Sequence, residues 1–116
     1  MTLTTLVLGA TALQREAAIA EALDPALTTA LILEGIASGH SPLDGMNGPR
    51  ISRIAPGCLC CTGNMAMRIT LNRTLRRPPQ RLYISLASSE HVESIRRFLA
   101  DTPYDDLLQL TQDMQT

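Results

Sequence analysis

The chain has 116 residues, 45% of them hydrophobic, so it is long and apolar enough to bury the core of one small domain over residues 1–116. Its net charge of −1 gives no overall attraction to nucleic acid, and it contains no lysine, which excludes a Schiff base and the lysine of a phosphate-binding loop. No apolar run approaches the roughly 20 residues of a membrane span, and the N-terminus lacks the basic and long apolar regions of a signal peptide. We therefore expect a single cytoplasmic domain without a nucleic-acid or membrane partner.

Strands and helices alternate along the sequence. Short apolar and β-branched runs predict strands, and apolar residues that recur every three or four positions predict helices. In chain order, these patterns predict a strand at Leu3–Leu8, a helix at Ala12–Leu23, strands at Thr28–Leu33 and Ile51–Ala55, a helix at Met65–Arg77, a strand at Arg81–Leu86 and a helix at Glu90–Ala100. Such alternation is typical of an α/β fold with a mainly parallel sheet and right-handed crossovers.

Polar and turn-forming residues mark the boundaries of these elements. Thr11 and Gln14 have the spacing of a capping box for the first helix, and Asp24-Pro25 ends that helix. The segment Glu34–Pro49 is rich in Gly, Ser, Pro, Asp and Asn, so we expect a long, mobile loop there. The tail from Asp101 contains a last short strand or helix.

The first strand-to-helix turn is where open α/β sheets commonly bind ligands. A phosphate-binding loop there has the form G-x-x-x-x-G-K-(S/T). Gly9 is present, but Gln14, Arg15 and Glu16 stand at the positions of the second glycine, the lysine and the hydroxyl residue. The wide guanidinium does not fit a site made for an amine, and the carboxylate would repel a metal-bound phosphate. We expect a capped corner here, in which Gly9 and Arg15 are the residues that any residual nucleotide binding would use.

All three cysteines lie within four consecutive positions, as Cys58, Cys60 and Cys61, between Gly57 and Gly63. Thiolates at this spacing can approach one soft metal ion, and because adjacent side chains diverge, two cysteines with other groups form the expected ligand set. In a chain without an export signal, clustered cysteines act as ligands or reactive thiols. The alternative is a tight turn in which the cysteines pack as small hydrophobic residues.

Taken in order, the segments of this chain resemble the N-terminal half of the CobW-like GTPases, metallochaperone relatives of HypB and UreG. Gly57–Cys61 matches the G-C-(I/L)-C-C motif of that family, and it is the most specific match. Leu33–Gly39 falls on the family's N-E-F-G-E-x-G motif, and Ser85–Val92 falls on its E-(T/S)-(T/S)-G-L-A-x-P motif. The resemblance implies a P-loop-NTPase-like three-layer fold with a mainly parallel sheet, truncated before the guanine-reading segment and the C-terminal domain.

The resemblance carries the function over in part. The P-loop lysine, the magnesium-binding hydroxyl and the Walker-B-like glutamate of the family are replaced here by Arg15, Glu16 and Ser85, which argues against GTP as a cofactor and against GTP hydrolysis. The C-x-C-C turn and Glu34 remain, and the family's pattern associates both with metal. The expected metal ligands are therefore Cys58, Cys60, Cys61 and Glu34.

Two histidines are further candidate ligands. His40 follows the strand that Glu34 ends, and His91 lies near the start of the last helix. A lone histidine is more often a surface residue than a ligand, and without the resemblance Glu34 is equally well read as a solvated loop acid. Thiolates with one nitrogen or oxygen ligand suit Zn²⁺ first, with Cu(I) or Co²⁺ as alternatives.

The leading hypothesis is a small, non-enzymatic protein that binds a transition metal and takes part in metal handling or homeostasis. A second hypothesis keeps nucleotide binding through Arg15, and a third is an interaction module that forms a homodimer or docks on a protein of a metallochaperone system. A thiol-redox role for the vicinal cysteines is the least supported, because adjacent cysteines form only a strained ring. The second helix carries Arg68, Arg73, Arg76 and Arg77, which we read as a solvated face, and as the place to look for an acidic partner or a dimer contact.

Overall fold

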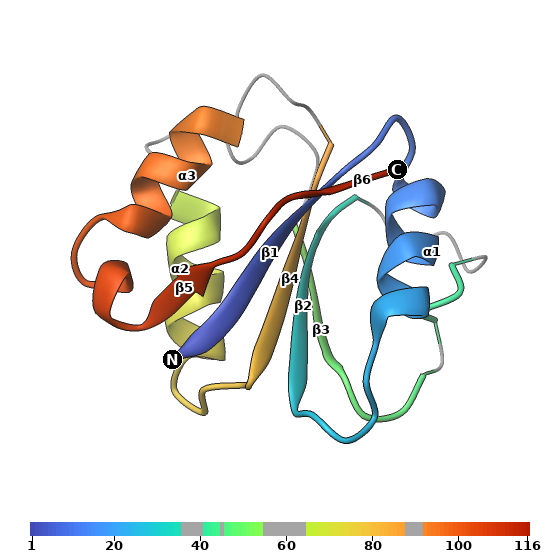
Figure 1. Ribbon diagram of the computed structural model, residues 1–116, viewed down its shortest axis with the longest axis horizontal. Helices are drawn as coiled ribbons and strands as arrows, with labels where there is room; N and C mark the ends of the chain where they lie inside the picture. Colours follow the sequence, from blue (N-terminus) through green and yellow to red (C-terminus); the bar gives the residue numbers. More distant parts are fainter. Residues whose placement is uncertain (36–40, 45, 55–64, 88–91) are drawn as a thin grey trace.

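The computed structural model describes residues 1–35, 41–44, 46–54, 65–87 and 92–116, and it confirms an α/β fold with a parallel sheet (Figure 1). Its elements in chain order are β1 (Thr2–Leu8), α1 (Ala12–Ala22), β2 (Thr29–Glu34), β3 (Arg50–Ile54), α2 (Met65–Thr74), β4 (Arg81–Leu86), α3 (Val92–Ala100), the 3₁₀ helix η3 (Tyr104–Asp106), β5 (Leu108–Leu110) and β6 (Met114–Gln115).

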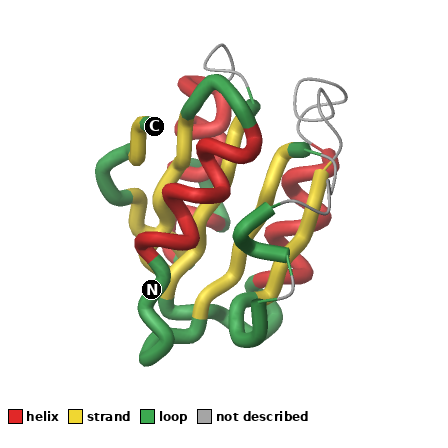
Figure 2. The backbone as a smooth tube through the Cα atoms, turned by 90° about the vertical axis from the view of Figure 1, so that its right-hand side faces the viewer, coloured by secondary structure: helices red, strands yellow, loops and turns green. Residues whose placement is uncertain are grey.

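The sheet has the order β3-β2-β4-β1-β5, and β6 also pairs with β1, beyond the end of β5. Every strand pair that the structure describes is parallel. The helix α1 covers one face, and α2 and α3 cover the other, so the fold has the three layers of a P-loop-NTPase-like domain (Figures 1 and 2).

Alternating side chains of the central strands build a core on each face of the sheet. On the α1 side, Ile19 packs with Tyr83 and with a set of fully buried aliphatic residues, which are Val7, Leu31, Leu33 and Leu43. On the opposite side, α2 and α3 contribute the buried residues Met67, Leu71, Ile95 and Leu99. Burial on both faces explains why the strands read as continuous apolar runs.

The predicted helix at Met65–Arg77 is one turn too long. The observed helix ends at Thr74, and the hydroxyls of Thr70 and Thr74 donate to the carbonyls of Ala66 and Thr70 along its last turns, a contact that slightly weakens helices. The N–H of Leu75 still donates to the Leu71 carbonyl, but that of Arg76 donates to Arg73, so the chain tightens before Pro78-Pro79.

The described residues between Glu34 and Arg50 form no helix or strand, which confirms the predicted loop there, although part of it is buried. Glu34 itself belongs to β2 and is 5% exposed, so its reading as a solvated loop acid is wrong. Leu43 is fully buried against the α1 core, and Ser41 is 8% exposed. The composition of the segment is turn-like, but the buried Leu43 packs its described part against the sheet.

The tail closes the sheet beside β1. Phe98 and Tyr104 pack with ring centroids 5.0 Å apart, the Tyr104 hydroxyl donates to Asn72 at 2.8 Å, and the Arg68 guanidinium lies 5.5 Å from the Phe98 ring centre. These contacts join α2, α3 and η3 and place β5 in register with β1. Among the described residues, no helix has both the length and the apolar character needed to cross a membrane.

A pair of substitutions on α2 tests the packing of this layer. Leu71→Ala removes a fully buried side chain, and we expect it to lower the free energy of unfolding by about 2–5 kcal/mol. The matched control is Ile69→Ala on the same helix, where the side chain is 51% exposed and the expected change is within about 0.5 kcal/mol. Urea unfolding followed by circular dichroism measures both, and equal losses would show that α2 does not pack as described.

Candidate functional site

The candidate site lies at the carboxyl ends of the parallel strands. The strands β1 and β4 are neighbours, but the chain leaves β1 into α1 on one face and leaves β4 toward α3 on the other (Figure 1). In open α/β sheets a crevice forms where the connections diverge in this way, and ligands bind there. The Gly9 turn, Glu34 and Ser85 all lie at this edge.

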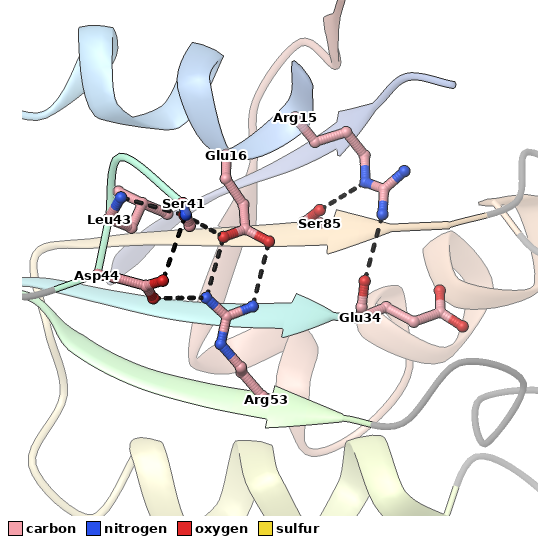
Figure 3. A network of polar contacts seen from close by, with 8 residues as sticks. All are labelled: Arg15, Glu16, Glu34, Ser41, Leu43, Asp44, Arg53 and Ser85. Carbon is pink, nitrogen blue, oxygen red and sulfur yellow. Dashed lines mark hydrogen bonds and ion pairs between the residues drawn. The ribbon is translucent and has the colours of Figure 1, made fainter. Parts of the chain in front are cut away.

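The crevice is occupied by the guanidinium group of Arg15. Its Nε donates to Ser85 Oγ at 2.7 Å, and its two terminal nitrogens donate to the carbonyl oxygens of Gly9 at 2.9 Å and Glu34 at 3.2 Å (Figure 3 shows the bonds to Ser85 and Glu34). The residue is only 2% exposed. One side chain from α1 therefore joins the ends of β1, β2 and β4.

The Arg15 guanidinium is charged although it is buried. Burial lowers the pKa of the Arg15 guanidinium from its usual value, and the carboxylates of Glu34 and Glu16 act in the opposite direction. An arginine remains charged at neutral pH despite such a shift. The edge of the sheet therefore contains a buried, permanent positive charge that the protein's own oxygens satisfy.

The groups that hold a phosphate in a nucleotide loop are used internally here. The backbone N–H of Gln14 donates to Thr11 Oγ1 at 3.1 Å, which confirms the predicted helix cap. A Cβ atom added to Gly9 would lie 1.8 Å from Thr116 Oγ1, because Thr116 packs against this turn and donates from its N–H and its hydroxyl to the Leu8 carbonyl. The glycine is needed for this close approach of the last residue.

Glu16 belongs to a second polar network beside the first. Arg53 on β3 donates through both terminal nitrogens to the Glu16 carboxylate, at 3.1 and 3.0 Å, and also to Asp44 at 3.3 Å (Figure 3). The Ser41 hydroxyl donates to the same carboxylate and accepts the backbone N–H of Leu43. The hydrogen bond with Glu16 raises the pKa of Arg53, against the effect of burial. The Glu16 carboxylate is thus bound by an arginine and a serine of the protein itself.

Sequence reasoning missed Arg53, Ser41 and Asp44. Strand alternation places Arg53 on the same face of β3 as Ile51, and the helix that covers this face carries Glu16. The contact between Glu16 and Arg53 can be predicted only once the strand order is known, because nothing in the local sequence pairs these two residues.

Glu34 is the one expected metal ligand within the described residues. Its Oε1 accepts the backbone N–H of Ala87 at 2.7 Å, and its Cα is in register with Ile54 of β3. Cys58, Cys60, Cys61, His40 and His91 lie outside the described residues. Within the part of the chain that the structure describes, no three His, Cys, Asp or Glu side chains are arranged to hold a metal ion.

Comparison with protein-family models gives no match, and no curated protein or solved structure is significantly similar to the chain.

The substitution Arg15→Lys tests the bridging role of the guanidinium. Lysine keeps the positive charge, but its three N–H donors share one nitrogen atom and cannot span three acceptors that the guanidinium reaches with three separate nitrogens. We expect a loss of about 2–4 kcal/mol in the free energy of unfolding, since buried carbonyls lose charged donors. The control Arg97→Lys, at an exposed position of α3, should change stability by less than about 0.5 kcal/mol. Equal unfolding midpoints for the two variants would contradict the bridging role.

Proposed function

We propose that this protein binds a transition metal, zinc first, through its C-x-C-C turn with Glu34 as a further ligand, and that it acts in metal handling or homeostasis. The observation that carries the proposal is the position of Glu34 at the carboxyl edge of the sheet. It precedes Gly35, it pairs with Ile54, and it accepts the N–H of Ala87. These three neighbours are the last described residues before segments 36–40, 55–64 and 88–91.

All of the other candidate ligands belong to those three segments. His40 ends the first, the three cysteines lie in the second and His91 ends the third. A backbone hydrogen bond also joins the ends of β2 and β3, because the N–H of Gly35 donates to the Ile54 carbonyl at 2.9 Å. Glu34 is therefore adjacent to the point where each ligand-bearing segment leaves the sheet. This convergence supports one shared site more than separate, unrelated side chains.

The chemistry of the donor set fits a borderline or soft divalent ion. Thiolates and imidazoles favour Zn²⁺, and a carboxylate is an accepted additional ligand. The hydrogen bond from the Ala87 N–H fixes one carboxylate oxygen of Glu34, and hydrogen bonds to ligand side chains orient the ligand atoms of metal sites. When bound, the metal would supply a Lewis-acidic or structural centre at the carboxyl edge of the sheet.

Nucleotide binding has less support than metal binding. A phosphate in the crevice would displace the Arg15 guanidinium from three oxygen acceptors and would meet the carboxylate of Glu16 nearby. Both steps cost free energy before any contact with the ligand forms.

The metal content of the purified protein tests the proposal directly. We expect the protein, purified under reducing conditions, to retain zinc and to compete with a chromogenic chelator, whereas the variant with Cys58, Cys60 and Cys61 all changed to serine does neither. The proposal would be falsified if wild type bound zinc no more tightly than this triple variant.

Glu34→Gln provides the matched test of the carboxylate. Glutamine keeps an oxygen that can accept the N–H of Ala87, so the fold contact survives while the charge is lost. We expect zinc affinity to fall by about 10-fold or more, as is typical when a supporting or weak ligand is removed. An unchanged affinity would remove Glu34 from the ligand set and leave the cysteine result unaffected.

A further inference from the structure

Strand β3 lies at one end of the sheet's strand order. Among the described residues, β3 pairs with β2 alone. The Ile54 carbonyl points toward β2, since it accepts the N–H of Gly35. Polar backbone groups of successive strand residues point to opposite sides, so the N–H and C=O of Ile51 and Arg53 point away from the sheet. An outward row of this kind is a template for one more strand.

Positive charge lies along this edge on the α2 side of the sheet. Arg50 belongs to β3, and its guanidinium donates to the Arg77 carbonyl at 2.5 Å, which brings the end of α2 beside the strand. Arg68 and Asn72 contact α3 and η3 on one flank of α2, whereas Arg73 lies on the flank turned away from α3.

No acidic residue occurs in β3 or α2, and no ion pair within the described residues involves Arg50, Arg73 or Arg77. The three charges therefore have no acidic partner in the part of the chain that the structure describes. The three guanidinium groups repel one another, and an acidic group placed among them would be attracted by all three.

The α1 side of the same edge is different in character. Ile51 is 37% exposed there, and the Arg53 side chain is already bound by Glu16 and Asp44. An added strand would therefore meet arginines on one face and an exposed aliphatic residue on the other. Because side chains of a strand alternate between faces, the best occupant alternates acidic and apolar residues.

We propose that β3 binds an extended acidic segment of a partner protein, which adds a strand to the sheet through the outward backbone groups of Ile51 and Arg53. The acidic side chains of the segment lie against Arg50, Arg73 and Arg77, and its apolar side chains lie against Ile51. A second copy of this chain is a poorer occupant, because pairing β3 with itself would bring two sets of arginines together. The inference rests on the sheet edge and holds whether or not the chain binds metal.

A blocked peptide of alternating glutamate and valine is the probe for this surface, added to the whole ¹⁵N-labelled chain. We expect saturable shifts of the Ile51 and Arg53 amide signals, and slower hydrogen exchange at these two amides when the peptide is bound. A lysine–valine peptide, and a glutamate–valine peptide with N-methylated backbone, should each bind at least about tenfold more weakly. Binding should also weaken as salt is added.

Charge reversal on the protein completes the test. The variant Arg73→Glu with Arg77→Glu should bind the glutamate peptide at least about tenfold more weakly and gain affinity for the lysine peptide, whereas Arg97→Glu on α3 should leave both unchanged. Urea unfolding verifies that the variants are folded. The proposal is overturned if the glutamate peptide does not bind, if the N-methylated peptide binds equally well, or if the Ile51 and Arg53 amides are unaffected at saturation.

Discussion

One buried guanidinium group determines what the carboxyl edge of this sheet can do. Arg15 reaches from α1 to oxygen atoms at the ends of β1, β2 and β4, and it is almost completely excluded from water. A buried cation is tolerated only when its donors are satisfied, so Arg15 and its acceptors must keep their positions together. The crevice where related architectures bind a ligand is filled by the protein itself. Any chemistry at this edge then depends on the neighbouring segments that begin at Gly35, Ile54 and Ala87.

The Glu16–Arg53 ion pair fixes the position of the next residue of α1 in the same way. It connects α1 to β3, and with Ser41 and Asp44 it holds the described part of the loop that follows β2. Arg15 and Glu16 thus belong to two internal polar networks at the start of α1. Within the described residues, β3 pairs only with β2, and its last residue, Ile54, precedes the segment that contains the cysteines. The closed crevice and β3 lie within one parallel sheet.

Local patterns were enough to predict the strands and helices from β1 to α3, apart from the end of α2, but could not predict these networks. The strand at Arg81–Leu86 and the start of α1 follow from apolar periodicity and the Thr11 cap, because neighbouring residues determine both. The contact between Arg15 and Ser85 joins residues far apart in the sequence, so it depends on which strands become neighbours. For the same reason, the packing of Thr116 on Gly9 could not be predicted from the sequence. The fit of arginine at a lysine position was predicted to be poor for phosphate, but its role as a bridge required the strand order.

The side-chain Nε–H signal of Arg15, identified by its loss in Arg15→Lys, reports most directly on the closed crevice. A ¹H–¹⁵N spectrum recorded during titration with Mg²⁺ and GTP measures both its exposure and its response. If the guanidinium closes the crevice, this proton exchanges far more slowly than that of the exposed Arg97 and its signal does not move up to about 1 mM nucleotide. A signal that exchanges as fast as Arg97, or that shifts with saturation in the micromolar range, would contradict the account.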